Sequence, residues 1–242
     1  MTIEVCAYSL ESCINAQVGG AGRIELCGGL GEGGTTPSAG LIEIVRQHVD
    51  IQLYVMIRPR GGDFVYDFFE EEIMKKDIDL VRKLRADGVV LGVLTADGQV
   101  DVPRTKALVE YAYPMKVTFH RAFDLTPDPV KALKAVIETG AARILTSGQK
   151  PTAAEGINLL GQLAKEAKGA IEIMAGGGVN ATNAADLKAA GVHALHLTAK
   201  AFRPGRQKYF REEISMAGAV PDERSVLYSD LSQIEAIVQV VA

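Results

Sequence analysis

Short apolar runs recur along the chain, and each run ends in small polar or glycine residues before a helix-like stretch begins. The clearest are VTFHRAFD (Val117–Asp124), RILTSG (Arg143–Gly148) and IEIMAGGGV (Ile171–Val179). An alternation of strand, polar loop and helix is typical of a parallel sheet. The pattern therefore predicts that the chemistry gathers at one end of that sheet.

Eight apolar runs predict strands, and amphipathic or proline-initiated helices separate them. The expected strands are 2–7, 23–27, 52–57, 88–91, 115–120, 143–145, 170–174 and 194–197. Eight strand–helix units without a linker favour an α/β fold of one domain, a closed TIM (β/α)8 barrel over residues 1–202. Residues 203–242 are expected to form a C-terminal extension of that domain. Apolar residues at helical spacing near its end predict a helix that packs on the barrel as structural cover or a subunit contact.

Composition narrows the choice of partners. Apolar residues make up 48 % of the 242 residues, which is enough for a large core, and the net charge of −4 comes without a basic block. We therefore expect no nucleic-acid partner. The first ten residues lack the pattern of a secretory signal, and no apolar run is long enough to span a bilayer, so we expect no membrane partner. Three cysteines without a CxxC pair indicate reduced thiols and a cytoplasmic location.

Residue parity in the strands predicts which side chains point into the barrel. The runs IEVC, IELC and IEIM each place two aliphatic residues on one face and a glutamate and a sulfur residue on the other. Cys6 and Cys27 then occupy equivalent positions on adjacent strands, about 5 Å apart. Two close thiols can hold Cu(I), with Met174 as a third soft neighbour. The alternative is that both cysteines are simply small apolar core residues.

Charged residues on the inward face need partners, because a buried unpaired charge is costly. Arg58, Arg60 and Arg121 are the expected partners of the inward glutamates. Glu25 is open to either a structural role or a role at the barrel mouth. His120 is a candidate acid–base group or ligand, and His196 is equally open to a functional and a structural role.

A triple glycine follows the seventh expected strand. Barrels often bind phosphate at the loops after strands 7 and 8, where backbone N–H groups meet a helix N-terminus. Gly176, Gly177 and Gly178 are thus candidates for an anion site, to which Ser147 and Thr198 would add donors. The alternative is a tight turn that requires glycine for its backbone angles.

Several of these motifs together resemble the CutC family of copper homeostasis proteins. The matching segments are RIELCGGL, GGTTPS, IRPRGGD, VTFHRAFD, ILTSGQK and IMAGGGV. The resemblance implies a TIM barrel, a cytoplasmic location, a homodimer and a link to copper, with Cu(I) at Cys6 and Cys27. The stretch after residue 208 matches less well.

Two functions follow from these observations. The first is a cytosolic copper homeostasis protein that binds Cu(I) through Cys6 and Cys27. The second is an isomerase or lyase that acts on a small phosphorylated or carboxylated metabolite. Glu25 or His120 would then move protons, and the three arginines and the triple glycine would hold the small anionic ligand.

Overall fold

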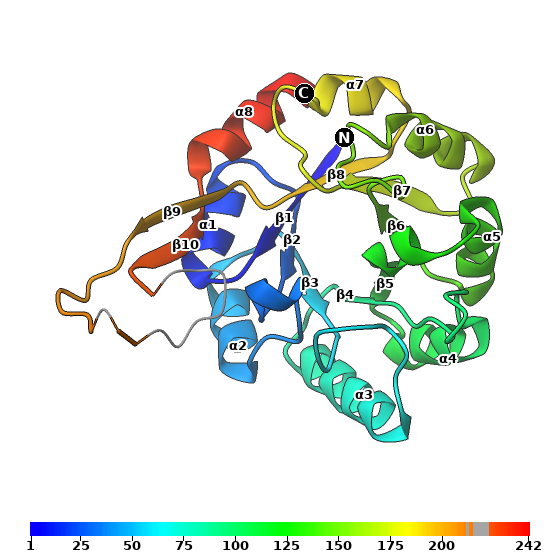
Figure 1. Ribbon diagram of the computed structural model, residues 1–242, viewed down its shortest axis with the longest axis horizontal. Helices are drawn as coiled ribbons and strands as arrows, with labels where there is room; N and C mark the ends of the chain where they lie inside the picture. Colours follow the sequence, from blue (N-terminus) through cyan, green and yellow to red (C-terminus); the bar gives the residue numbers. More distant parts are fainter. Residues whose placement is uncertain (212, 215–222) are drawn as a thin grey trace.

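The computed structural model describes residues 1–211, 213–214 and 223–242 and contains a closed barrel of parallel strands (Figure 1). Each strand from β1 to β8 pairs with its neighbour in the chain, and β8 pairs with β1. The strands are β1 (Thr2–Ala7), β2 (Arg23–Leu26), β3 (Gln52–Met56), β4 (Gly88–Leu91), β5 (Lys116–Phe119), β6 (Arg143–Thr146), β7 (Glu172–Gly176) and β8 (Ala194–Leu197). The predicted TIM barrel is confirmed, and all eight strands fall where the apolar runs place them.

Helices surround the barrel. They are α1 (Leu10–Val18), α2 (Ala39–His48), α3 (Phe68–Lys83), α4 (Val102–Ala112), α5 (Pro129–Thr139), α6 (Ile157–Glu166), α7 (Ala184–Ala189) and α8 (Leu231–Val241), with short 3-10 turns η1 (Leu30–Glu32) and η2 (Arg121–Leu125). Ser9 caps α1 by accepting a hydrogen bond from the Ser12 amide. Within the part of the chain that the structure describes, no helix has the length and apolar character needed to cross a membrane.

The alternation of side chains along each strand separates the outer core from the barrel interior. Ile3 and Val5 of β1 belong to the large apolar cluster beneath the helices, while Cys6 belongs to a small separate cluster inside the barrel. Glu4, which has the same parity as Cys6, is fully buried. Strand parity therefore places polar groups in the interior, but it fails for Glu172, which was expected to point inward and is exposed at the start of β7, where it pairs with Arg143.

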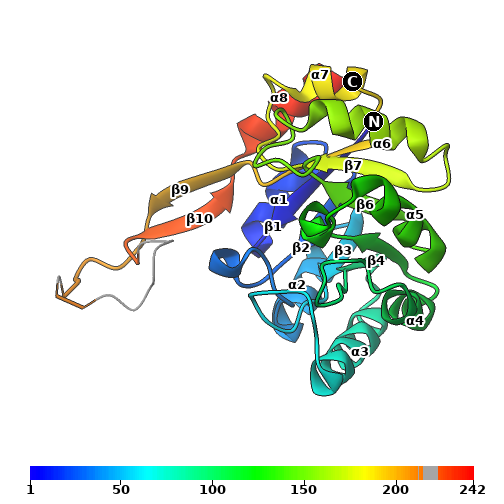
Figure 2. The same cartoon turned by 45° about the vertical axis from the view of Figure 1, so that its right-hand side comes forward.

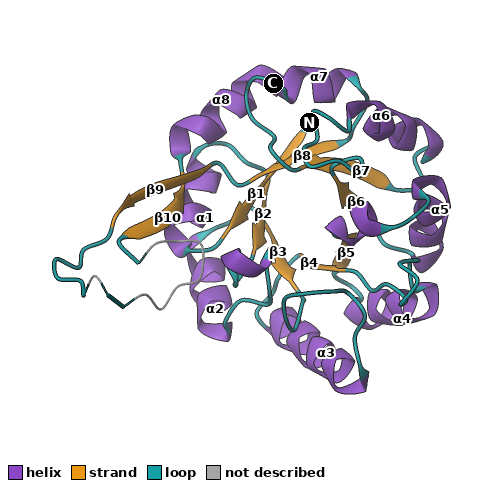
Figure 3. Ribbon diagram, viewed as in Figure 1, coloured by secondary structure: helices purple, strands orange, loops and turns teal. Residues whose placement is uncertain are grey.

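The C-terminal extension contains a feature that the sequence pattern did not predict. Strands β9 (Lys200–Pro204) and β10 (Ser225–Ser229) form an antiparallel pair outside the barrel ring, and this pair projects away from it (Figures 2 and 3). The expected boundary between residues 202 and 203 falls inside β9. The expected terminal helix is α8, which packs against α1 and α7. Residues 212 and 215–222 of the expected extension lie outside the described residues.

Gly88 shows how tightly the barrel interior is packed. Its register partner on β3 is Tyr54, which is fully buried. A Cβ atom at Gly88 would lie 2.3 Å from Cε1 of the Tyr54 ring. The arginines Arg23 and Arg143 lie over the same ring, at 5.1 and 5.4 Å from its centroid, so the ring has little room to move.

We therefore predict that Gly88→Ala lowers the free energy of unfolding by about 1–3 kcal/mol, since overpacking forces strain into a filled core. Chemical denaturation measures the change. Gly40→Ala on α2 is the matched control, because a Cβ atom there would have no neighbour within 4 Å among the described residues. We expect that control to be neutral or to stabilise by up to about 1 kcal/mol. Equal effects of the two variants would contradict the packing argument.

Candidate functional site

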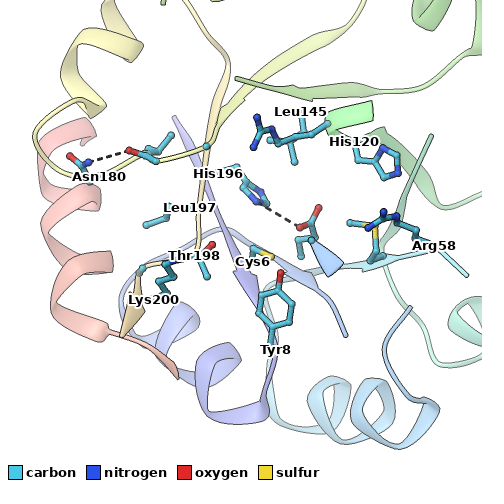
Figure 4. A pocket seen from close by; sticks show the side chains of 18 of the residues that line it. Cys6, Tyr8, Arg58, His120, Leu145, Asn180, His196, Leu197, Thr198 and Lys200 are labelled. Atoms are coloured by element: carbon cyan, nitrogen blue, oxygen red, sulfur yellow. Dashed lines mark hydrogen bonds and ion pairs between the residues drawn. The ribbon is translucent and has the colours of Figure 1, made fainter. Parts of the chain in front are cut away.

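A cavity of about 450 Å³ opens at the C-terminal mouth of the barrel (Figure 4). This is the end at which TIM barrels carry their active sites. The predicted site residues that line it are Cys6, Glu25, Arg58, His120, Arg121, Gly177, Gly178 and Thr198, and His196 lines it as well. Figure 4 shows His196 beside Cys6, with Tyr8 next to them. Arg60, Ser147, Gly176 and Cys27 are not among the residues that line this cavity.

Three ionisable side chains form a row across adjacent strands, and one of them, His196, reaches the cavity. The barrel register pairs Glu4 of β1 with Arg23 of β2 on one side and with His196 of β8 on the other. The Glu4 carboxylate forms an ion pair with Arg23, and its Oε1 atom accepts a hydrogen bond from Nδ1 of His196 at 2.7 Å. Glu4 is fully buried, so this row holds a carboxylate that water cannot reach.

The row sets the charge states of its members. Burial alone would raise the pKa of Glu4, but the hydrogen bond from His196 and the charge of Arg23 lower it to about 2. Burial would lower the pKa of His196, but the charge of Glu25 and the hydrogen bonds with Cys6 and Glu4 raise it well above its ordinary value. Glu4 is therefore a carboxylate, and His196 carries a proton on the nitrogen that faces it.

Above this row lie two thiols and a second buried carboxyl group. The Sγ atoms of Cys6 and Cys27 are 3.8 Å apart, and Cys27 donates a hydrogen bond to Oε2 of Glu25 at 3.5 Å. The hydrogen bond with Cys27 lowers the pKa of Cys6, while the same contact raises the pKa of Cys27. Burial and the neighbouring Cys6 raise the pKa of Glu25. Cys6 is thus the thiol of the pair that deprotonates more easily.

His120 occupies the opposite side of the mouth and differs in charge from His196. Burial and the nearby Arg58 guanidinium lower the pKa of His120 to about 3, so the ring is neutral at neutral pH. Its Nδ1 atom accepts the Ala122 amide at 3.3 Å, and its Nε2 atom has no hydrogen-bond partner among the described residues. The ring packs over Gly92, where a Cβ atom would come within 2.7 Å of it. His120 therefore suits hydrogen-bond donation from Nε2 better than proton abstraction.

The three predicted arginines do not pair with the buried glutamates, and that expectation was wrong. Arg58 donates to the carbonyl oxygens of Glu32, Gly34 and Gly62, and so ties the glycine-rich loop after β2 to the loop after β3. Arg121 donates to Asp124 and to Ser147, both at 2.8 Å.

Arg60 lies away from the cavity. Its guanidinium forms ion pairs with Glu70, at the start of α3, and with Asp63 at 3.0 Å. The alternation that positions side chains within a strand ends with β3 at Met56, so it does not extend to residue 60. The prediction that Arg60 lies at the mouth of the barrel is therefore wrong.

The three consecutive glycines differ in their surroundings, and the two with positive φ angles line the cavity. Gly176 is the last residue of β7, and a Cβ atom there would lie 2.5 Å from Leu145, so packing requires glycine. Gly177 and Gly178 have φ angles of +102° and +71° and line the cavity. Ser147 is buried, and its hydroxyl contacts Asp124 and the Lys150 carbonyl.

Two further corrections concern sulfur and charge. The Met174 sulfur accepts a hydrogen bond from Nη2 of Arg23 at 3.4 Å and belongs to a different apolar cluster from the thiols, so it is not their third neighbour. The sequence pattern did not identify Arg23 as a partner of Glu4, although Arg23 has the same parity as Glu25 on the same strand.

The sequence pattern did not identify Asp124 either. Its carboxylate accepts hydrogen bonds from the hydroxyl of Thr146 and the amides of Ser147 and Gln149, and these bonds fix the loop after β6.

The fold and the cluster define a class: a (β/α)8-barrel protein with a thiol–carboxylate–imidazole site at the C-terminal mouth. The CutC family model matches residues 1–201. A CutC family protein of Chromobacterium violaceum is 48 % identical over 97 % of this chain and 96 % of its own length. The mouse protein named copper homeostasis protein cutC homolog is 44 % identical over 97 % of this chain and 87 % of its own.

The chain therefore belongs to the CutC family. A crystal structure of CutC from Streptococcus agalactiae superimposes with a TM-score of 0.78 at 36 % identity, and covers 82 % of this chain and 98 % of that one. Thiamine phosphate pyrophosphorylase from Pyrococcus furiosus superimposes with a TM-score of 0.61 at 17 % identity, covering 99 % of this chain and 95 % of that one. The second match concerns the barrel fold alone.

The buried row makes Glu4 a test of what holds the site together. We predict that Glu4→Gln lowers the free energy of unfolding by about 3–5 kcal/mol, because it leaves the Arg23 charge buried without a partner. Denaturant unfolding measures this change. Glu11→Gln is the control, since it breaks the exposed ion pair between α1 and Arg203, and it should cost at most about 1 kcal/mol. A similar small loss for both variants would contradict the assigned role of Glu4.

Proposed function

We propose that this protein acts in copper homeostasis by binding Cu(I) between the thiols of Cys6 and Cys27. The observation that carries the proposal is the 3.8 Å separation of the two Sγ atoms inside the barrel. The mouse and human relatives bear names that refer to copper homeostasis. A cytoplasmic location and a homodimer, both implied by the family, are part of the same proposal.

The chemistry of the two thiols fits Cu(I). Thiolate sulfur is a soft ligand that selects Cu(I) over hard cations. Both residues are buried, at 5 % and 1 % exposure, and Cys6 lines the cavity, so an ion can reach the thiol pair from the barrel mouth. The lowered pKa of Cys6 favours the thiolate that binding needs, whereas Cys27 must give up its proton as the ion enters.

We predict that the reduced protein binds one Cu(I) per chain and that Cys6→Ser and Cys27→Ser each weaken binding more than about tenfold, because the loss of a ligand should cost at least as much as the loss of a residue that only orients one. Anaerobic competition with a Cu(I) chelator measures the affinity. Cys13→Ser is the matched control, because this third cysteine is buried on α1. An unchanged affinity in the Cys6→Ser/Cys27→Ser double variant would sink the proposal.

The cavity favours a second candidate function, an isomerase or lyase acting on a small phosphorylated or carboxylated metabolite. A carrier of one copper ion needs no space of 450 Å³, but a small metabolite does. Arg121, Gly177 and Gly178 line one part of it, and Glu25 and His120 line another. In this function the first three residues would bind the anion and Glu25 would move the proton. The neutral His120 would donate a hydrogen bond to developing negative charge.

We predict that inorganic phosphate raises the melting temperature of the protein, because a ligand that binds only the folded state stabilises it by about 2.7 kcal/mol at 100 times its Kd. Arg121→Gln should abolish the shift. Arg46→Gln is the control, since Arg46 also pairs with an aspartate, Asp87, but lies on α2. If neither phosphate nor a small carboxylate shifts the melting temperature, that result counts against the anion site.

We also predict that native mass spectrometry of the protein gives the mass of a dimer, as the proposed homodimer requires.

A further inference from the structure

Three side chains of different chemistry converge at the floor of the cavity. One ligand atom each from Cys6, Glu25 and His196 lies within 4.8 Å of the others, and all three residues are buried and line the cavity. We propose that they form a binding site for a divalent metal ion of the Zn²⁺ type, with a fourth coordination position that faces the cavity. This goes beyond the proposed Cu(I) pair: it shares Cys6 with that pair but uses neither Cys27 nor Cu(I).

The spacing suits one ion at the centre of the three atoms. Imidazole nitrogen and carboxylate oxygen each bind Zn²⁺ at about 2.0–2.2 Å, so in a tetrahedral site the two atoms lie about 3.4 Å apart. Nε2 of His196 and Oε2 of Glu25 are 3.7 Å apart before any ion is bound. A movement of a few tenths of an ångström brings this nitrogen–oxygen pair to the tetrahedral spacing, and the Cys6 sulfur lies within 4.8 Å of the other two ligand atoms.

Glu25 supplies an independent observation. Its side chain is about 2 % exposed, and its Oε1 atom has no hydrogen-bond partner within the described part of the chain. A buried carboxyl oxygen without a partner costs free energy, so native proteins rarely retain one without a reason. A cation held by both carboxylate oxygens would give Oε1 its missing partner and keep the carboxylate ionised, while Oε2 is the oxygen that lies nearer to His196 and accepts from Cys27.

His196 is oriented as a metal ligand would be. Its Nδ1 atom donates to Glu4 at 2.7 Å, and Glu4 is fixed by Arg23. This leaves Nε2 directed toward Glu25 and available for an ion once it loses its proton. Metal-ligating histidines almost always donate their other ring N–H to a carboxylate or carbonyl, which fixes the tautomer.

The donor set points to the class of metal and to the use of the open position. One thiolate, one imidazole and one carboxylate suit a borderline ion such as Zn²⁺, whereas Cu(I) selects sulfur. Three protein ligands with a fourth position open are the arrangement of catalytic rather than structural zinc sites. The fourth position faces a cavity that Arg121, Gly177 and Gly178 also line, so it suits a phosphate or carboxylate oxygen.

Co²⁺ provides the test, because four-coordinate Co²⁺ has intense visible absorption and a thiolate ligand adds a near-ultraviolet charge-transfer band. We expect tag-free, reduced protein to bind one Co²⁺ with both signatures and to release it when Zn²⁺ is added. Cys6→Ser, Glu25→Gln and His196→Gln should each weaken Co²⁺ binding at least about tenfold. The matched controls are Cys13→Ser, Glu172→Gln and His193→Gln, whose side chains lie outside the cavity. They should bind as the wild type does.

The variant Cys27→Ser separates this inference from the copper proposal. It should keep the Co²⁺ spectrum and lose Cu(I) affinity. If wild-type protein shows only the weak absorption of six-coordinate Co²⁺, the divalent site is overturned and the copper proposal is untouched. If Cu(I) affinity survives in Cys27→Ser while the Co²⁺ results hold, the copper proposal fails and the divalent site stands.

Zinc-edge X-ray absorption of the wild-type protein tests the same ligands without relying on variants that could fail to fold. One sulfur with two or three nitrogen or oxygen neighbours supports the three-ligand site. Two sulfur neighbours would make Cys27 a ligand and overturn it.

Discussion

The buried carboxylate of Glu4 organises the charges and hydrogen bonds of the candidate site. An ionised group without water is stable only if its charge is matched and its oxygens are hydrogen-bonded. The closure of β8 onto β1 supplies both, because it brings His196 next to a residue that β2 already pairs with Arg23. The same closure directs the second nitrogen of His196 toward Cys6 and Glu25. Electrostatics at the mouth thus follow from the register of three strands.

The two histidines at the mouth show how surroundings decide the charge of one residue type. His196 lies between two glutamates and a thiol, which raise its pKa. His120 is equally buried but faces the Arg58 guanidinium and the Phe64 ring, and its pKa falls to about 3. One side of the cavity therefore favours a protonated imidazole, and the other side offers a neutral hydrogen-bond donor. A small ligand between them would meet both kinds of group.

The loops around the cavity are held by polar contacts. Arg58 joins two loops through three backbone carbonyls, and Asp124 holds the loop after β6 through a hydroxyl and backbone amides. The loop after β7 is held in the same way, because the Gly177 carbonyl accepts from the Ala153 amide and the Gly178 carbonyl accepts from the side chains of Asn180 and Asn183. The copper and metabolite proposals use different parts of this frame, since the thiols lie at its floor and the glycines at its rim.

The barrel, the bounds of most strands to within one or two residues, and the inward direction of Glu4, Cys6, Glu25 and Cys27 could all be predicted from the amino-acid sequence. These features depend on local apolar periodicity, which each segment carries alone. The contacts between these side chains became clear only from the tertiary structure. Glu4 forms its ion pair with Arg23 and not with Arg58 or Arg121, and the Met174 sulfur accepts a hydrogen bond from Arg23 and does not join the thiols. The tertiary structure also places Arg60 away from the cavity, because the alternation of side chains along β3 ends at Met56. Partner choice depends on register and barrel closure, and these are set by contacts between residues as distant in the chain as Glu4 and His196.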